Sequence, residues 1–335
     1  MKALPLLLLI FVLGSCNKTN DKKATTPCLE TAFLQTNISE PLQSVFFLNG
    51  RDGFVSGYSG GIYKTQDSAR TWTPLNSTVN LPVYDLFFID AQKGFAVGGQ
   101  NSCGGTGCIP PGGFILRTLD GGASWAKVYT PTGKTEITSI FFVDALKGFC
   151  VGDNVIFKTT DGGQSWSEYV IANLNGKLMD VKFVSPQKGY VVGLFDKVVT
   201  TEDGGATWQV RSPQRSTGYY AISEANGATY VSGQGKIIKS TNGGNTWTDL
   251  VNSPADIFAL HFTDAKRGFA FGRGNYSGGD FGRPYGAIYC TTDGGITWNG
   301  TAEVKEVGLI EAVSFPSNTI GYAVSGKSVI RVTAR

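Results

Sequence analysis

The chain has 335 residues, 45 of them glycine, and a formal net charge of +3. Its many glycines and aromatic residues, without any long helical pattern, indicate an all-β protein. So small an excess of positive charge does not imply an anionic surface or a nucleic acid as partner, and we expect no nucleic-acid binding.

The first residues have the layout of an export signal. Lys2 precedes an apolar run that ends at Leu13 and is too short to cross a bilayer. The run ends in LGSC, which resembles a bacterial lipobox, whose cysteine becomes lipidated after cleavage. We therefore expect a lipoprotein signal peptide over residues 1–15 and a lipid at Cys16; the alternative is an ordinary signal peptide cut nearby.

Residues 16–27 (CNKTNDKKATTP) are polar, rich in lysine and without apolar periodicity. This composition is typical of a flexible tether. One acylated N-terminus would hold an otherwise soluble body, residues 28–335, at a membrane. We expect the protein in the cell envelope, at the outer membrane or the cell surface.

Six copies of an eight-residue pattern contain every tryptophan of the chain, and the clearest copy is TTDGGQSW at residues 159–166. A short Asx side chain can accept backbone N–H bonds across a turn, and paired glycines supply positive φ at little cost. Each tryptophan can then lie across the seam to a neighbouring sheet. We expect looser turns in the first copy, which has Ser68 and Ala69 for the glycines, and in the fifth, which has an asparagine. The Asx residues, expected to be structural, are Asp67, Asp120, Asp161, Asp203, Asn242 and Asp293.

The segments around these turns repeat as four-stranded meanders. In one unit the strands are residues 139–143, 148–152 and 155–159, followed by the Asp turn and a strand that opens at Trp166. The second strand, of GFxVG type, occurs seven times, although there are only six Asp turns. The last unit stops before a fourth strand, and residues 29–35 stand where such a strand would precede the first unit.

Closing the ring with this N-terminal strand removes the exposed sheet edges. Uninterrupted spacings of 41, 42 and 39 residues between tryptophans agree with the length of propeller blades. The sequence therefore predicts a single seven-bladed β-propeller over residues 28–335, closed by an N-terminal strand.

The TxDGGxTW turns look like Asp-box (BNR) repeats, and their coupling to the GFxVG strand resembles the propellers of the photosystem II assembly and stability factor family and its non-photosynthetic relatives. The likeness covers residues 29–335. It implies a non-catalytic protein-interaction module outside the cytoplasm. Asp-box propellers also include sialidases, xyloglucan hydrolases and sortilin-like receptors, so a glycoside hydrolase or a carbohydrate-binding propeller is the alternative.

Two units are longer than the others, and both insertions, residues 99–113 and 273–286, fall between the second and third strands. In such a meander these loops emerge on the face opposite the Asp turns. Long loops on a rigid scaffold are common binding sites, and arginine and aromatic residues are enriched at interface hot spots. We therefore predict that a protein or glycan partner binds this face, with candidate residues Arg273, Tyr276, Phe281, Arg283 and Tyr285.

Cysteine usage suggests a disulfide rather than a metal site. Cys103 and Cys108 lie close together in a glycine-rich loop of an exported protein, which predicts a bond between them. A metal site would need two more thiols or imidazoles, and His261, the only histidine, lies in an inner strand at the register of three phenylalanines. We expect no metal and a packed, structural histidine. Cys150 and Cys290 are expected to be small core residues, and the pairing of Cys28, Cys150 and Cys290 is left open.

An enzyme would need side chains that the sequence does not bring together by spacing. A sialidase-like enzyme requires an arginine cluster and a Tyr/Glu pair, and the FRIP motif of that family is absent. A xyloglucanase-like enzyme requires two facing carboxylates. We expect no cofactor and favour the non-catalytic interaction module. The arginines that could share the face of the two long loops are Arg211, Arg215, Arg273 and Arg283, and the carboxylates that could form a pair are Asp85, Asp153, Asp180, Asp196 and Asp280.

Overall fold

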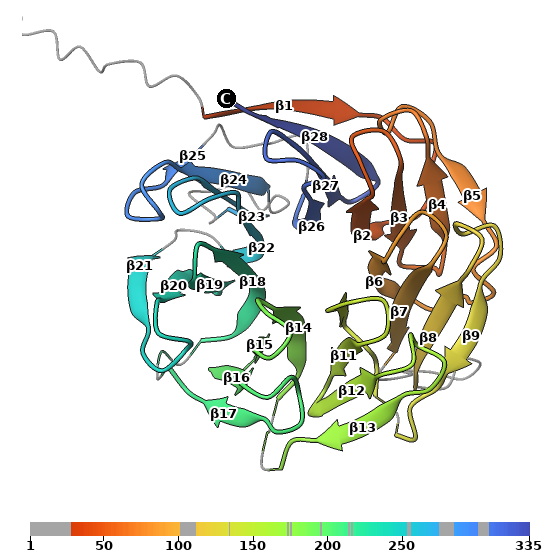
Figure 1. Ribbon diagram of the computed structural model, residues 1–335. Coiled ribbons are helices and arrows are strands. Elements are labelled where there is room, and N and C mark those ends of the chain that lie inside the picture. The colour runs from red at the N-terminus through yellow and green to blue at the C-terminus, as the bar shows by residue number, and fades with distance from the viewer. Residues whose placement is uncertain are drawn as a thin grey trace, which may run out of the picture.

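A computed structural model describes residues 28–335 apart from 101–111, 134, 173, 175, 195, 214, 216, 253–255, 275–284 and 301–307. The described residues form 28 β-strands in seven four-stranded antiparallel sheets, arranged as blades around a central opening (Figure 1). The predicted seven-bladed propeller is confirmed. None of the elements in the described ranges is an apolar helix of membrane-spanning length. The expected signal peptide and tether lie outside these ranges.

Each of blades one to six contains four consecutive strands from the channel to the rim, and blade seven takes its outer strand from the N-terminus. The inner strands are β2 (Leu42–Phe47), β6 (Val83–Phe88), β10 (Ser139–Phe142), β14 (Leu178–Phe183), β18 (Tyr219–Ala225), β22 (Asp256–Phe262) and β26 (Ile310–Ser314). The second strands are β3 (Gly53–Gly57), β7 (Gly94–Gln100), β11 (Gly148–Gly152), β15 (Gly189–Gly193), β19 (Ala228–Gly233), β23 (Gly268–Arg273) and β27 (Ile320–Ser325). The third strands are β4 (Ile62–Thr65), β8 (Gly112–Thr118), β12 (Val155–Thr159), β16 (Lys197–Thr201), β20 (Lys236–Ser240), β24 (Gly286–Thr291) and β28 (Ser328–Ala334). The outer strands are β5 (Thr73–Leu75), β9 (Ala126–Tyr129), β13 (Ser167–Val170), β17 (Gln209–Arg211), β21 (Thr248–Asn252), β25 (Asn299–Gly300) and β1 (Leu29–Leu34).

The two ends of the described chain close the ring. Strand β1 pairs antiparallel with β28, with Leu29 opposite Ala334 and Leu34 opposite Val329 (Figure 1). The predicted closure by the N-terminal strand is therefore confirmed. It covers the edge of β28, which would otherwise present unpaired backbone groups.

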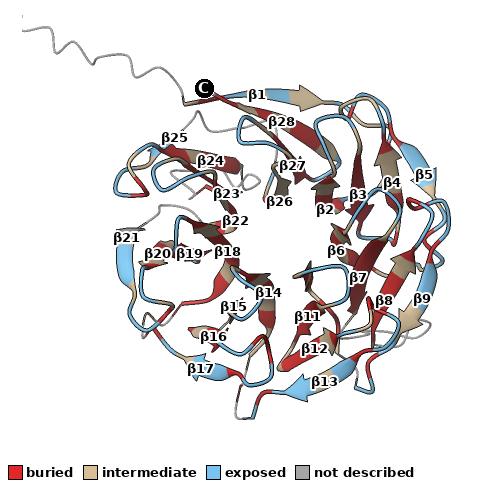
Figure 2. Ribbon diagram, in the orientation of Figure 1, coloured by how far each residue is buried: buried red, intermediate tan, exposed pale blue. Residues whose placement is uncertain are grey.

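The core lies in the seams between blades. The second strands are buried along nearly their whole length, whereas the outer strands are largely exposed (Figure 2). At the seam between blades two and three, the rings of Phe95 and Phe142 stack with centroids 4.4 Å apart. Trp166 meets Phe95 edge-on at 6.4 Å. The tryptophan of one blade thus packs across the seam against the preceding blade, as expected.

The Asp turn is fixed by side-chain acceptors. Asp161 Oδ1 accepts hydrogen bonds from the backbone N–H groups of Gln164 (2.9 Å) and Ser165 (3.0 Å), and its Oδ2 accepts one from the Ser165 hydroxyl (2.6 Å). Thr159 Oγ1 accepts a bond from the backbone N–H of Gly163 (2.9 Å). The Ser165 hydroxyl, with the backbone N–H bonds, lowers the pKa of Asp161. The carboxylate is therefore committed to holding the turn.

The expectation of looser turns in the first and fifth copies is wrong. Ser68 and Ala69 both adopt φ of 65°, the region taken by glycines in the other copies. Asp67 accepts bonds there as Asp161 does, and Asn242 Oδ1 accepts the backbone N–H of Thr246 at 2.9 Å. The side-chain acceptors hold the turn, so the glycines lower its cost without being required for its shape.

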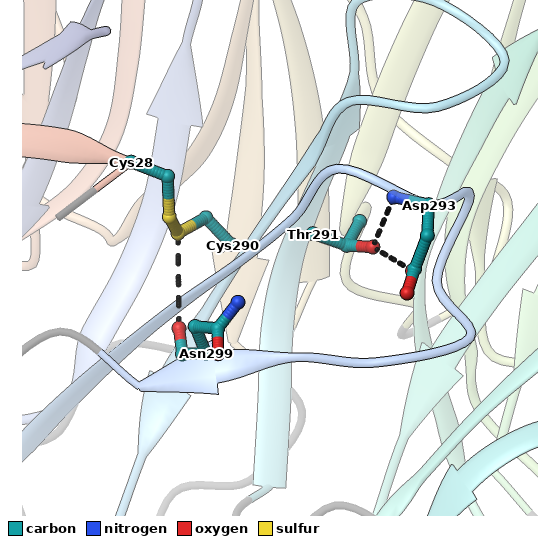
Figure 3. The surroundings of a disulfide bond; sticks show 5 residues. All are labelled: Cys28, Cys290, Thr291, Asp293 and Asn299. Atoms are coloured by element: carbon teal, nitrogen blue, oxygen red, sulfur yellow. Dashed lines mark hydrogen bonds between the residues drawn. A yellow bond between two sulfur atoms is a disulfide. The ribbon is translucent and has the colours of Figure 1, made fainter. Parts of the chain in front are cut away.

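A disulfide joins Cys28 to Cys290, which settles the pairing that the sequence left open (Figure 3). Cys290 is a buried core residue, as expected, and it is also half of this bond. The two Cα atoms are 6.4 Å apart although 262 positions separate the residues in sequence. Ring closure brings them together, because Cys28 precedes β1 of blade seven and Cys290 lies in β24 of blade six. Cys150 is free and buried, and Cys103 and Cys108 lie outside the described residues.

The disulfide joins blades six and seven at a strand position where other blades have a basic side chain that bonds to the next blade. Lys64 and Lys158 lie in third strands. Their ammonium groups donate hydrogen bonds to backbone carbonyls in the Asp turn of the next blade, those of Gly121 (3.0 Å) and Gly205 (3.1 Å). Lys64 and Lys158 pair with the first aromatic residue of the second strand, and Cys290 has the same pairing in β24. Blade seven has no Asp turn to receive a lysine, and the seam is joined covalently instead.

Candidate functional site

The inner strands line a central cavity of about 520 Å³. Strand register places the lining side chains on three levels, which follow one another along the channel axis. The middle level is polar on blades one to four and carries only methyl groups on blades five to seven. Its residues, in blade order, are Ser44, Asp85, Ser139, Asp180, Ala221, Ala259 and Ala312.

Asp85 joins three blades. Its Oδ1 accepts hydrogen bonds from the Ser44 hydroxyl of blade one (3.1 Å) and from the backbone N–H of Leu86 (2.8 Å). Its Oδ2 accepts the backbone N–H of Ile140 in blade three (2.9 Å). Burial raises the pKa of Asp85 to about 7, against the opposing effect of these donors. Both oxygens therefore serve as structural acceptors between blades.

Asp180 repeats this arrangement two blades further on. It accepts bonds from the Ser139 hydroxyl of blade three (3.1 Å) and from the backbone N–H of Ile222 in blade five (2.8 Å). Burial raises its pKa as well. Asp85 and Asp180 were catalytic candidates from the sequence. In the structure, their carboxylates accept hydrogen bonds that join neighbouring blades.

The other candidate carboxylates lie in turns between strands or outside the described residues. Asp196 is buried in the β15–β16 turn and accepts bonds from the hydroxyls of Ser212 (2.6 Å) and Tyr219 (3.1 Å). Asp153 occupies the β11–β12 turn with φ of 44°. Asp280 lies outside the described residues. Within the described ranges, no three His, Cys, Asp or Glu side chains gather closely enough to hold a metal ion.

The described candidate arginines lie in two separate places. Arg211 and Arg215 line a rim cavity of about 380 Å³ between blades four and five, where Arg215 pairs with Asp249 at 2.7 Å. Arg273, at the end of β23, pairs with Asp256 of the inner strand. Arg283 lies outside the described residues, and the described arginines form no carboxylate-gripping cluster.

The predicted binding loops are described only at their ends. Arg273 is exposed at the end of β23, and Tyr285 precedes β24, its carbonyl accepting the backbone N–H of Gly274 at 3.0 Å. Both lie at the end of the channel where the inner strands begin, since Arg273 pairs with Asp256. Tyr276, Phe281 and Arg283 lie outside the described residues.

A ring of bulged residues at this mouth was missed from the sequence. Six of the seven inner strands shift register at the same place, near their first residue, and the extra side chain lines the cavity. The sequence signal was the presence of two residues, rather than one, between buried apolar positions, as in LQSV at residues 42–45. The bulged residues are Gln43, Tyr84, Met179, Tyr220, Phe258 and Glu311.

The ring is chemically uneven. On blades five and six, Tyr220 and Phe258 stack with centroids 4.6 Å apart, and on blade seven burial raises the pKa of Glu311 to about 7. On blade two, Tyr84 carries the ammonium of Lys177 over its ring at 5.6 Å, and Lys177 pairs with Glu136 of blade three. The mouth thus combines aromatic rings with carboxylates and an ammonium.

Aromatic rings line part of the opposite end of the channel. Phe46, Phe87 and Phe141 stand side by side, with successive centroids 5.5 Å apart. His261 stacks on Phe315 at 4.3 Å, and burial lowers its pKa to about 3. The histidine is therefore neutral and packed, which agrees with the structural role expected for it.

One family model matches part of the chain. The family model described as "Photosynthesis system II assembly factor YCF48" matches residues 168–330. A search of the curated proteins gave no match.

Solved structures resemble the chain along most of its length. The structure titled "YCF48 bound to D1 peptide" has a TM-score of 0.69 at 18% identity, covering 93% of this chain and 98% of that one. YCF48 from Cyanidioschyzon merolae has a TM-score of 0.68 at 17% identity, with coverage of 91% and 98%. The GH74 enzyme of Niastella koreensis has a TM-score of 0.68 at 18% identity; the match covers 89% of this chain but 53% of the enzyme, so the chain spans about half its length. At these identities the structures show the fold alone, and together with the family model they identify the chain as a BNR-type propeller that resembles the photosystem II assembly factor family.

Proposed function

We propose that this chain is an exported, membrane-tethered, non-catalytic propeller that binds another protein, in the manner of an assembly factor. The observation that carries the proposal is the match over nearly the full length of a propeller whose title describes it as bound to a D1 peptide. The family model supports it independently over residues 168–330. The carboxylates of the channel wall also support it, because Asp85 and Asp180 already use their oxygens between blades.

Export is supported by the covalent structure. A disulfide such as Cys28–Cys290 persists in oxidising compartments, which include the bacterial periplasm and the cell surface. The chain would then consist of a signal peptide over residues 1–15, a tether over 16–27 and the propeller over 28–335. Because Cys28 precedes an outer strand, a tether from a lipidated Cys16 would be attached at the rim and leave both faces of the ring accessible.

Lipidation has a direct measurement. Mass spectrometry of the mature N-terminus should find Cys16 as the first residue, carrying acyl chains. An unmodified Cys16, or a terminus at another residue, would contradict the anchor while leaving the binding proposal in place.

We place partner recognition on the face where the β7–β8 and β23–β24 loops begin and end. Second-to-third strand loops share this face with the connections between blades and with the channel mouth. Arg273 and Tyr285 stand at the ends of the second loop, and Tyr276, Phe281 and Arg283 belong to its undescribed part. A protein partner is favoured, and a glycan is the alternative.

Capture of the native partner tests this placement. The tagged protein is crosslinked in its native membrane, and a second strain carries both loops shortened to the length of the β11–β12 turn. The matched control is Ile296→Ser, since Ile296 is 69% exposed in an Asp turn on the opposite face. We expect the loop-shortened protein to fold and lose the partner, and the control to retain it; equal capture by all three would overturn the placement.

A glycoside hydrolase is the second candidate, favoured by the likeness to the GH74 enzyme. Purified protein should be assayed on xyloglucan and on sialosides. Hydrolysis that Asp153→Asn or Asp280→Asn abolishes would replace the binding module with an enzyme. Binding of these glycans without turnover would instead identify a carbohydrate-binding propeller.

A further inference from the structure

We propose that the channel mouth at blades five to seven binds an alkylammonium group, and that its source is a lysine side chain of the bound protein. The choice of lysine as source rests on the proposed function; the ammonium site itself does not. The site consists of Tyr220, Phe258 and Glu311, the bulged residues of three successive blades.

The bulges direct these side chains into the cavity. A bulge adds one residue to a strand, so the next positions keep their pairing while the extra side chain points elsewhere. In β26 the shift lies between Ile310 and Ala312, and Glu311 consequently lines the channel. Tyr220 and Phe258 are placed in the same way, so strand pairing alone accounts for their common level.

Glu311 is the unsatisfied member of this group. Among the described residues the structure shows no hydrogen-bond donor or cation at its carboxylate, and burial is the cause of its raised pKa. Asp85 and Asp180, by contrast, receive backbone N–H bonds. A half-buried carboxylate without a partner is stabilised by any cation that enters, because a charge-assisted hydrogen bond offsets its lost hydration.

The neighbouring aromatic rings suit an organic cation. Tyr220 and Phe258 stack at 4.6 Å with 23° between their planes, and both line the cavity. Aromatic faces attract ammonium groups, and their apolar bodies pack against the methylene stem that carries such a group. A lysine side chain provides both parts.

Space for the stem lies beneath the three residues. The next level of the same blades consists of Ala221, Ala259 and Ala312, the smallest side chains of the channel wall, whereas blades one to four carry serine and aspartate there. The hollow therefore lies directly under Tyr220, Phe258 and Glu311. An unbranched side chain that enters here meets alanine methyl groups and not the serine and aspartate groups of blades one to four.

The charge of the channel also favours a cation. Lys177 is paired with Glu136, and His261 is neutral. Among the described lining residues, Lys182 is then the one other basic group beside the three carboxyl groups of Asp85, Asp180 and Glu311, and burial raises the pKa of all three carboxyl groups. A cation that enters favours their ionised form. The same mouth already holds one ammonium over a ring, that of Lys177 on Tyr84 at 5.6 Å.

The test uses a small probe, Nα-acetyl-lysine methylamide, with binding followed by ligand-observed saturation-transfer NMR and by titration. Two analogues remove the charge: the Nε-acetylated form and the norleucine form. We expect Glu311→Gln to weaken probe binding at least about tenfold, the ratio expected for the loss of a charge-assisted hydrogen bond. Tyr220→Leu should also weaken it. Met179→Leu, a conservative change at the same level on blade four, is the matched control and should bind as the unaltered protein does.

The outcomes separate this inference from the proposed function. Cadaverine, a free diamine, serves as a second probe. The ammonium site is overturned if neither the acetyl-lysine probe nor cadaverine binds. It is also overturned if the neutral analogues bind as well as the charged probe, or if Glu311→Gln binds the probe as well as the unaltered protein does. If cadaverine binds through Glu311 but the acetyl-lysine probe does not, the site holds a free amine and the assignment to a partner's lysine is wrong. Loss of native-partner capture concerns the proposed function alone, because the probe requires no partner.

Discussion

Removing the Cys28–Cys290 disulfide should destabilise the propeller without changing its architecture. The bond spans 262 positions, so it constrains nearly the whole described chain in the unfolded state. The chain-entropy relation gives about 5 to 6 kcal/mol for a loop of this length. Compact unfolded ensembles reduce that value, and losses on removal of native disulfides are typically about 2 to 5 kcal/mol.

The expected change is measurable by thermal unfolding. Unfolding about 300 residues carries an entropy of roughly 0.6 kcal/mol/K, so a loss of about 2 to 5 kcal/mol lowers the midpoint by about 3 to 8 °C. The Cys28→Ser, Cys290→Ser double variant is compared with the unaltered protein under oxidising and reducing conditions. Under reducing conditions the unaltered protein and the variant should have the same midpoint.

The variant also separates this bond from a Cys103–Cys108 disulfide, which reduction would break in both proteins. A further fall of the double variant's midpoint on reduction measures that second bond. Equal midpoints for the oxidised unaltered protein and the double variant would refute the reasoning, because the ring would then be closed fully by the pairing of β1 with β28.

Three further changes test the seams and turns. Trp166→Ala removes a buried indole and should cost about 3 to 5 kcal/mol in urea or guanidinium unfolding, whereas a cost below 1 kcal/mol would show that the seam closes around the gap. Asp85→Asn tests how stability depends on pH. The pKa of Asp85 is raised to about 7 in the folded protein, so the stability that this group contributes is largest below about pH 4 and is lost as pH rises towards 7. The stability of the unaltered protein relative to Asp85→Asn should therefore fall between pH 4 and 7, and a pH-independent difference would exclude a raised pKa. Asp120→Asn tests the opposite sign: the Ser124 hydroxyl and N–H lower the pKa of Asp120 to about 2, so its contribution is complete above about pH 4 and is lost towards pH 2. Thermal midpoints measured from pH 5 to 2 should converge for the two proteins, and parallel curves would contradict the assignment.

Local patterns in the sequence were sufficient for the architecture. GFxVG strands recur because each blade buries its second strand between two neighbours, and Asp turns recur because blades one to six form this turn on the same side-chain acceptors. The excess of one GFxVG strand over the Asp turns predicted that residues 29–35 complete the last sheet, and β1 does so. The error at this level was the expectation of looser turns in the first and fifth copies: the acceptors Asp67 and Asn242 hold both turns, the first without glycines.

The functional surface depended on contacts that no local pattern contains. Asp85 was a candidate catalytic carboxylate until the structure showed its oxygens bonded to Ser44 and to Ile140, which lie 41 and 55 positions away. Glu311 drew no attention in the sequence, because only the register of β26 against β27 shows that it is the extra residue of a bulge.

The sequence by itself determined the blade count, the turns and the closing strand, since each follows from the period of residues close together in the chain. Only the tertiary structure decided that Cys28 meets Cys290 and that the bulged side chains of six blades share one mouth. The physical reason is ring closure: it brings together positions up to 262 residues apart, and their distance depends on the twist and register of every blade between them.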